Sequence, residues 1–334
     1  MNELIITNAT IVMRDDIRRG SVLVRDGVIA DIAPSTTQHQ HAIDLDGDFL
    51  LPGLIEMHTD DAERHFSPRS GYLWPASISA LLAHDAQLAG AGITTVYDAI
   101  SVGTYSPTSL RPKILASLID AIEQAAGADI LRADHRIHLR CEVSDDNVIE
   151  QFSPYASHPL VQLVSLMDHT PGQRQWQNLD DLRRFQKTKM SDRDWAQFVE
   201  DSIARRSQNA AAYRAEIVRH AQSRGIPIAT HDDTTVEHVD EAIRDGANIS
   251  EFPTTRNAAT AAKAKGMATV MGAPNVVRGG SHSGNVAATE LAEAGLLDGL
   301  SSDYMPMSLI DAPFVLHEKH GLPIPGAIAL VSSN

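Results

Sequence analysis

The stretch that decides the fold is Leu50-Leu51-Pro52-Gly53-Leu54-Ile55-Glu56-Met57-His58-Thr59-Asp60. Its apolar part predicts a buried strand from Leu54 to His58, and residues two apart on a strand point to the same face. His58 and Asp60 are therefore expected side by side at the strand end, where an imidazole and a carboxylate suit a divalent cation. A chain with 15 His and 43 acidic residues also brings such pairs together by chance, so this pair requires partners elsewhere in the sequence.

Further strands are predicted from the apolar runs that follow this stretch. Helix-period segments separate the runs, which is the pattern of parallel βα units. The eight predicted strands are 54–58, 93–99, 136–143, 161–168, 227–231, 248–252, 267–272 and 297–303. Eight such units favour an α/β fold with a closed, TIM-like (β/α)8 barrel over an open doubly wound sheet, which the count alone does not exclude.

Residues 1–50 have a different pattern of apolar and polar residues from the rest of the chain. Short alternating apolar stretches are broken by Asp26-Gly27 and Asp46-Gly47, which are turn signals of the hairpin type. This pattern predicts a small N-terminal β domain over residues 1–50, followed by the barrel domain over residues 51–334.

A long polar segment at about 171–225 interrupts the barrel pattern after the fourth strand. Helix starts are predicted at Asn178 and Ser191, and Gly225 is a helix stop. An insertion at this side of a barrel can cover the active site, or it can be an extended outer pair of helices. We prefer the first interpretation.

Composition limits the classes of function that the chain can have. With 43% hydrophobic and 21% charged residues it reads as globular, and a net charge of -15 argues against nucleic-acid or anionic-membrane partners. Cys141 is the only cysteine, so an intramolecular disulfide is excluded. The N-terminus lacks the features of a signal peptide and no apolar run approaches membrane-spanning length, so we expect a cytoplasmic protein. The sequence leaves open whether the chain forms a homo-oligomer.

Potential metal ligands end several of the predicted strands, on the face where barrels place their chemistry. The six candidates are His58, Asp60, Glu142, His169, His231 and Asp303. Three histidines and three carboxylates are enough for two divalent cations if one carboxylate bridges them, and this donor set suits Zn²⁺, Mn²⁺ or Fe²⁺. Each residue alone is more commonly a helix cap or a loop hydrogen-bond partner, so their shared placement carries the prediction.

Several neighbours compete with these candidates. Asp232 and Asp233 follow one of the histidines and Asp168 precedes another, and each could bind metal or support a ligand. Glu56 shares a strand face with His58 and could be a buried partner rather than a ligand. Four other histidines rank lower as ligands, and one of them, at position 84, lies in a helix-period stretch where a packed or surface role is the default: His65, His84, His138 and His282.

A glycine-rich stretch follows the seventh predicted strand, from Gly272 to Asn285. Its backbone N–H groups and small polar side chains could cradle phosphoryl oxygens, although a glycine-rich turn without a ligand is about as common. The substrate-binding candidates here are Arg278, Gly279, Gly280, Ser281, His282, Ser283 and Asn285. Arg69, Arg140 and Arg174 are further cations expected near the same face, where they would balance an anionic substrate; surface ion pairs are the alternative.

These features together resemble the amidohydrolase superfamily of metal-dependent barrel hydrolases. The resemblance rests on the small N-terminal β region, the run from Leu51 to His58, the run Gly92-Ile93-Thr94-Thr95-Val96 and an aspartate at the eighth strand. More specific strings are similar to the PhnM-type family of the carbon-phosphorus lyase pathway. They are His58-Thr59-Asp60, His138-Leu139-Arg140-Cys141-Glu142, Val164-Ser165-Leu166-Met167-Asp168-His169, Glu251-Phe252-Pro253-Thr254-Thr255, Met271-Gly272-Ala273-Pro274-Asn275, the run from Arg278 to Asn285, and Ser301-Ser302-Asp303-Tyr304.

The resemblance implies an enzyme that releases pyrophosphate from the 5-triphosphate of a small phosphorylated ribose phosphonate and leaves the 5-phosphate. It implies two metal ions that activate a water, with Asp303 as general base, His231 beside it in the catalytic centre, and Arg278 on the polyphosphate. Two alternatives stay open. One is hydrolysis of a cyclic amide or N-acyl substrate by the same site, and the other is a non-catalytic metal-bound scaffold.

The chain departs from the superfamily pattern in two ways. It has His-x-Asp where most members have His-x-His, and it lacks a lysine in the fourth strand, so Glu142 is assigned as the bridging ligand by analogy with members that use a strand-three glutamate. Similar proteins continue beyond Asn334 with a segment that completes the small β domain. This chain is therefore expected to lack that segment and to expose apolar edge surface on its N-terminal strands.

Overall fold

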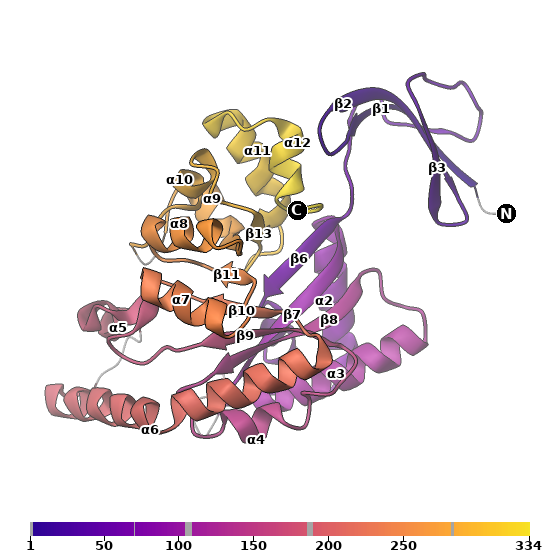
Figure 1. Ribbon diagram of the computed structural model, residues 1–334. Helices are drawn as coiled ribbons and strands as arrows, with labels where there is room; N and C mark the ends of the chain where they lie inside the picture. The colour runs from indigo at the N-terminus through magenta and orange to yellow at the C-terminus, as the bar shows by residue number, and fades with distance from the viewer. Residues whose placement is uncertain (1–2, 70, 104–108, 186–189, 282–283) are drawn as a thin grey trace.

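The centre of the molecule is a sheet of eight parallel strands in chain order, β6 to β13 (Figure 1). The computed structural model describes residues 3–69, 71–103, 109–185, 190–281 and 284–334. The strands are β6 (Leu54–Thr59), β7 (Ile93–Val102), β8 (Asp134–Glu142), β9 (Val161–Met167), β10 (Ile228–His231), β11 (Ile249–Glu251), β12 (Ala268–Gly272) and β13 (Gly299–Ser301). Each predicted strand is present, with ends shifted by a few residues, and the predicted (β/α)8 barrel is confirmed.

The sheet curls until its two edge strands meet. A bridge pairs Thr59, at the end of β6, with Asp303, just after β13. The amide of Asp303 donates to the carbonyl of His58, and the amide of Asp60 donates to the carbonyl of Asp303, both at 3.0 Å. We call this junction the seam. Because it lies at the carboxyl ends of the strands, the nearly closed barrel joins its first and last strands beside the predicted ligands.

Glu56 fastens the seam from inside the barrel. Its side chain is fully buried, and its two oxygens accept hydrogen bonds from the amides of His58 at 2.7 Å and Ser302 at 2.6 Å. Burial raises the pKa of Glu56 to about 7, although these two bonds act in the opposite direction. Glu56 is thus a buried partner of the backbone rather than a cavity-lining ligand.

We expect Glu56→Ala to lower the thermal unfolding midpoint by several degrees, because two buried amides lose their acceptor at about 1–3 kcal/mol each. Glu56→Gln keeps one acceptor oxygen and should fall between this variant and the wild type. Scanning fluorimetry measures the shift, with Glu318→Ala, at an exposed position of α11 (Ser308–His320), as the control. Equal midpoints for the Glu56 and Glu318 variants would show that Glu56 does not stabilise the seam.

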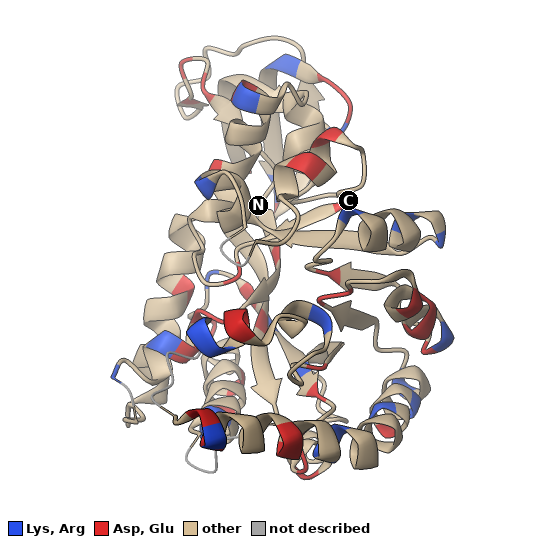
Figure 2. Ribbon diagram, turned by 90° about the vertical axis from the view of Figure 1, so that its left-hand side faces the viewer, with Lys and Arg blue, Asp and Glu red and all other residues tan. Residues whose placement is uncertain are grey.

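Helices cover the outside of the barrel and bury its apolar wall. They are α1 (Ala62–Phe66), α2 (Ser77–Gly90), α3 (Arg111–Gly127), α4 (Val148–Phe152), α7 (Val236–Arg244), α8 (Arg256–Ala264), α9 (Ala273–Arg278), α10 (Ala288–Glu293), α11 and α12 (Ile324–Ala329). Two apolar clusters fill the layer between wall and helices, one around Leu118 and Ile137 and the other around Ile93 and Leu309. Charges of both signs are spread over the outer helices (Figure 2). Among the described residues, none of the helices has the length and apolar character needed to span a bilayer.

The insertion after β9 consists of helices that reach the carboxyl end of the barrel. They are η1 (Arg174–Trp176), α5 (Leu179–Phe185) and α6 (Asp192–Arg224). The hydroxyl oxygen of Ser191 caps α6 by accepting from the amide of Asp194 at 3.2 Å, and Gly225 ends it with φ of 65°. Trp176 and Leu182 pack in a small apolar cluster and also line the cavity described below. Side chains of the insertion therefore form part of the cavity wall.

A separate five-stranded sheet is formed by the N-terminal residues, and β1 to β3 stand to one side of the barrel (Figure 1). Its strands are β1 (Glu3–Val12), β2 (Ile17–Arg25), β3 (Val28–Ala33), β4 (Ile43–Asp44) and β5 (Phe49–Leu50). Asp26 and Gly27, with φ of 48° and 82°, make the tight turn between β2 and β3 that the Asp-Gly signal predicts. On the edge strand β3, Val28 and Ile29 are 67% and 62% exposed.

Candidate active site

The carboxyl ends of the barrel strands open into a cavity of about 510 Å³. Five of the six predicted ligands line it, namely Asp60, Glu142, His169, His231 and Asp303. The sixth, His58, lies behind the cavity wall with a fully buried side chain, and its ring centroid is 5.6 Å from that of His231. The six residues therefore gather at one end of the barrel, because parallel strands all end there.

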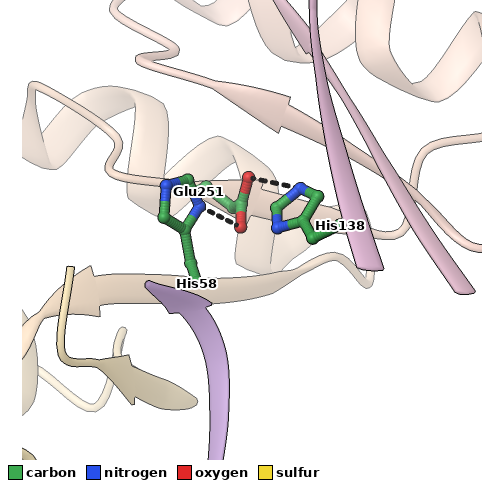
Figure 3. Close-up of side chains that lie close together, drawn as sticks. All are labelled: His58, His138 and Glu251. Carbon is green, nitrogen blue, oxygen red and sulfur yellow. Dashed lines mark hydrogen bonds and ion pairs between the residues drawn. The ribbon is translucent and has the colours of Figure 1, made fainter. Parts of the chain in front are cut away.

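Glu251 holds His58 from behind (Figure 3). The carboxylate at the end of β11 lies between two imidazoles, with one oxygen 3.0 Å from His58 Nδ1 and the other 3.7 Å from His138 Nε2. The His138 ring is fixed in turn by Ser165 Oγ at 3.0 Å and by the carbonyl of Met57 at 3.2 Å. With Nδ1 engaged by a carboxylate, His58 presents Nε2 for coordination, which is how metal-bound histidines are usually oriented.

His169 and His231 form a second pair of imidazoles around Asp232. The Asp232 Oδ2 atom lies 2.8 Å from His231 Nδ1 and 3.4 Å from His169 Nε2. His169 Nδ1 lies 2.7 Å from Glu142 Oε2. The donor atoms of His169, His231 and Asp232 are all within 4.8 Å of one another. Asp232, one of the competing carboxylates in the sequence, therefore joins the candidate ligands.

The electrostatic environment gives His58 and Asp303 different protonation behaviour. Burial, helped by the Arg140 guanidinium, lowers the pKa of His58 well below its ordinary value, so the ring is neutral, as a metal ligand must be. Burial and the neighbouring carboxylate of Asp60 raise the pKa of Asp303 to about 6. A pKa in this range suits a group that accepts a proton near neutral pH.

The donors at this end of the barrel fit a divalent cation. His58 Nε2 and His231 Nε2 are buried and have no hydrogen-bond partner among the described residues, although leaving a buried polar group unpaired costs about 1–3 kcal/mol. Carboxylates of Asp60, Glu142 and Asp303 stand around the same cavity. Neutral imidazole with carboxylate is the ligand set that Zn²⁺ and similar ions prefer.

Three residues beside these donors have a left-handed backbone conformation, which residues other than glycine rarely adopt. They are Asp232, Phe252 and Asp303, with φ of 58°, 53° and 54°. For a bulky aromatic residue this conformation costs on the order of 1 kcal/mol or more. All three lie where a strand ends at the cavity, so the strain marks the sharp turns that direct side chains into the site.

Three arginines line the cavity and can meet an anionic ligand in an otherwise acidic protein: Arg111, Arg140 and Arg278. Arg140 Nη1 lies 3.7 Å from Asp60 Oδ2, so this cation stands directly beside a candidate ligand. Arg111 Nε donates to Glu63 at 2.9 Å. Guanidinium groups recognise phosphoryl oxygens through paired N–H donors.

Two of the arginines predicted to bind substrate do not line the cavity. Arg174 is 4% exposed and is paired with Asp233 and, at 3.1 Å, with Glu241, so its charge is used between the barrel wall and the outer helices. Arg69 is exposed and its backbone bridges to Tyr72 outside the cavity. Arg174 is therefore engaged in buried ion pairs, and Arg69 is exposed away from the cavity, so neither side chain lies where a ligand in the cavity would be.

The glycine-rich loop contributes only part of its predicted set to the cavity. Gly280, Ser281 and Asn285 line the cavity together with Arg278. Gly279 instead ends α9 with φ of 79°, a conformation that glycine adopts without strain. His282 and Ser283 lie outside the described residues.

Sequence reasoning missed Glu251 and Arg111. Glu251 ends β11 and lies one residue before the end of the predicted strand 248–252, so the rule that site residues lie at the carboxyl ends of strands could have found it. Arg111 begins α3, and nothing in its neighbourhood in the sequence distinguishes it from a surface arginine. In the structure Arg111 belongs to the site because the first residue of α3 lies at the rim of the cavity.

We expect Glu251→Gln to weaken metal binding by about 10- to 100-fold, because an amide supports the His58 ring less well than a carboxylate does. Competition with a chromophoric chelator measures the affinity, and Glu318→Gln at the exposed α11 position is the control. An unchanged affinity in Glu251→Gln would contradict the positioning role.

Comparisons with known proteins show both a close relative and a shared fold. A protein of Escherichia coli (strain K12), named alpha-D-ribose 1-methylphosphonate 5-triphosphate diphosphatase, is 43% identical over 335 residues, covering 99% of this chain and 88% of that protein. A dihydroorotase of Carboxydothermus hydrogenoformans is 41% identical over 58 residues, which is 16% of this chain. No family model matches the chain.

Solved structures with little sequence identity have the same fold. A dihydropyrimidinase from Brevibacillus agri superposes with a TM-score of 0.59 at 14% identity, covering 99% of this chain and 80% of that one. A metal-dependent hydrolase from Pyrococcus furiosus gives a TM-score of 0.59 at 11% identity, covering 99% and 93%. At these identities the two structures support the barrel architecture and nothing about the substrate.

Proposed function

We infer the function of this chain from its family: it belongs to the alpha-D-ribose 1-methylphosphonate 5-triphosphate diphosphatases. From that membership we propose that it hydrolyses the 5-triphosphate of alpha-D-ribose 1-methylphosphonate 5-triphosphate, giving the 5-phosphate and pyrophosphate. The observation that carries the proposal is the 43% identity to the Escherichia coli enzyme across 99% of the chain. The arginine-lined cavity beside a cluster of imidazoles and carboxylates supports it independently.

The residues proposed to hold metal are His58, Asp60, Glu142, His169, His231 and Asp303, with Asp232 bonded to two of the histidines. We propose two divalent cations of the Zn²⁺, Mn²⁺ or Fe²⁺ type. When bound, such ions neutralise charge on phosphoryl oxygens and lower the pKa of a water molecule.

Asp303 is proposed to take the proton of the attacking water. Its carboxylate lines the cavity, and burial keeps its pKa at about 6. Both backbone groups of Asp303 are hydrogen-bonded across the seam, which fixes the direction of the side chain. The water oxygen then bonds to phosphorus, the bond to the oxygen that bridges the α and β phosphorus atoms breaks, and pyrophosphate leaves.

Arg111, Arg140 and Arg278 are proposed to hold the phosphoryl groups, because they line the same cavity as Asp303. Negative charge builds up on the oxygens of the departing pyrophosphate in the transition state. Cations that are already positioned beside these oxygens stabilise that charge most effectively. Apolar side chains of the insertion, Trp176, Leu182 and Phe198, form part of the cavity wall and limit the access of bulk water.

We expect Arg278→Ala to raise KM for the triphosphate by about 10- to 100-fold, since hydrogen bonds to charged groups contribute about 1.5–3 kcal/mol. The matched control is Arg69→Ala, which removes an exposed arginine that the sequence also marked but that lies outside the cavity. Steady-state kinetics measure both variants. Equal KM values for the two would remove Arg278 from the substrate site.

One assay tests the proposed function. Purified protein loaded with Mn²⁺ or Zn²⁺ is given the ribose phosphonate 5-triphosphate, a nucleoside triphosphate and a dihydropyrimidine, and pyrophosphate release and ring opening are followed. We expect pyrophosphate from the ribose phosphonate. Ring opening without pyrophosphate would support a cyclic amide hydrolase instead, and inactivity toward all three would support a metal-bound scaffold.

We propose that residues 1–50 and 51–334 act as a small β domain and a catalytic barrel domain, with the insertion at about 171–225 as a cover. A cytoplasmic location is proposed because the substrate is a phosphorylated metabolite.

A further inference from the structure

A second group of buried donors lies outside the cavity, between the loop after β6 and the outer helix α2. It consists of Asp61, His65 and His84, whose donor atoms are all within 4.8 Å of one another. The side chains of Asp61 and His84 are 1% and 0% exposed, and that of His65 is 21% exposed. The catalytic residues proposed above do not include any of the three.

The spacing of these donors matches a small divalent cation. Asp61 Oδ2 lies 3.4 Å from His65 Nε2 and 3.8 Å from His84 Nδ1, and the two ring centroids are 5.4 Å apart. In a tetrahedral zinc site with bonds of about 2.0–2.1 Å, neighbouring ligand atoms are separated by about 3.4 Å. Small side-chain adjustments would therefore place all three donors around one ion.

Two of the donor atoms lack any other partner. Asp61 Oδ2 and His84 Nδ1 are buried and have no hydrogen-bond partner among the described residues. Arg64 occupies the other oxygen of Asp61, with Nε 2.7 Å from Oδ1, which leaves Oδ2 directed at the histidines. Buried polar atoms without partners are uncommon in proteins, and a bound ion is one arrangement that satisfies them.

A carboxylate on the far side of the His84 ring supports this imidazole, as it does for histidines in known metal sites. His84 Nε2 lies 2.7 Å from Asp98 Oδ1, and the other oxygen of Asp98 lies 2.8 Å from His135 Nδ1. A carboxylate behind a histidine fixes the ring and increases its basicity toward a metal. Gln87 Oε1 lies 3.2 Å from His65 Nε2, so this nitrogen, unlike the other two donor atoms, has a hydrogen-bond partner that an ion would replace or share.

We propose that Asp61, His65 and His84 form a structural site for a Zn²⁺-type divalent cation, completed by Gln87 or water. The ion would join α1, which carries His65, to α2, which carries His84. Because Asp61 directly follows the candidate ligand Asp60, it would also hold the end of β6 in place. The competing occupant is a proton, which would make His84 an imidazolium between Asp61 and Asp98.

The test compares the metal content of zinc-saturated protein after removal of free ions. We expect His65→Gln to bind one equivalent per chain fewer than the wild type, as measured by mass spectrometry of the metals. The matched control is His158→Gln. His158 has the same exposed fraction, 21%, and also pairs with a carboxylate, Glu123, at 3.3 Å. Equal metal content in the wild type and His65→Gln would overturn the proposal.

A second measurement keeps this site separate from the catalytic centre. In cobalt-substituted protein, His65→Gln should lose one set of visible absorption bands, and His231→Ala should lose a different set while retaining the first. Nitrogen NMR of the zinc-saturated wild type should show His84 without a proton on Nδ1. A doubly protonated His84 ring would assign the position to a proton and overturn the metal site, whatever the outcome of the substrate assay.

Discussion

Asp303→Asn is expected to lower kcat by about 10²- to 10⁴-fold while the protein stays folded. Asparagine has nearly the same size and keeps an oxygen toward the cavity, but it has no carboxylate to accept a proton from water. The backbone bonds of residue 303 across the seam do not depend on the side chain. The loss should therefore appear in turnover, measured as pyrophosphate released per unit time, with metal content largely retained.

The control for this variant is Asp311→Asn, at an exposed position of α11. It makes the same chemical change in the same part of the chain and should leave kcat unaltered. If Asp303→Asn retains the turnover of the wild type, Asp303 is not the general base. If it loses its metal together with its activity, the residue acts mainly as a ligand.

Removing the metal is expected to abolish turnover, by about 10³-fold or more, because charge stabilisation by a bound ion contributes several kcal/mol to such reactions. Prolonged dialysis against a chelator gives the metal-free protein, and adding Zn²⁺ or Mn²⁺ should restore the activity. The dependence of activity on metal is expected because the Nε2 atoms of His58 and His231 are buried without a hydrogen-bond partner among the described residues and are therefore available to bind an ion.

The control is protein dialysed with chelator and an excess of metal, which should remain active throughout. His231→Ala should stay inactive after metal is added back, because one of the two unpaired ring nitrogens is gone. Full activity in protein shown to be free of metal would contradict the proposed centre.

Most of the barrel could be predicted from the sequence, for a physical reason. The strands of a parallel barrel are buried on both faces, so Val161–Met167 is a mostly apolar run and Ile93–Val102 is rich in apolar and β-branched residues, with helical segments between such runs. The short strands Ile249–Glu251 and Gly299–Ser301 were predicted too long. Their ends are determined by backbone pairing with a neighbouring strand, which a single sequence does not contain.

The site could be predicted only for residues that lie at the carboxyl ends of barrel strands, where such folds place their functional side chains. That rule placed Asp60, Glu142 and Asp303 at the cavity. It gave no information about pairing, so it could not distinguish an arginine that faces the cavity from Arg174, which is neutralised in the layer behind it. Nor could it show that Glu251 orients His58, because that contact joins residues 193 positions apart.

The seam also has a consequence for the time at which a newly made molecule becomes an enzyme. Thr59 and Asp303, which join there, are 244 positions apart. At a synthesis rate of about 5–20 residues per second, roughly 12–50 s pass between them. During that interval the other candidate ligands are added one after another, and there is no enclosed cavity to hold them. The cavity is complete only when the last barrel strand joins the first, so an incomplete translation product that stops short of β13 lacks both Asp303 and the seam.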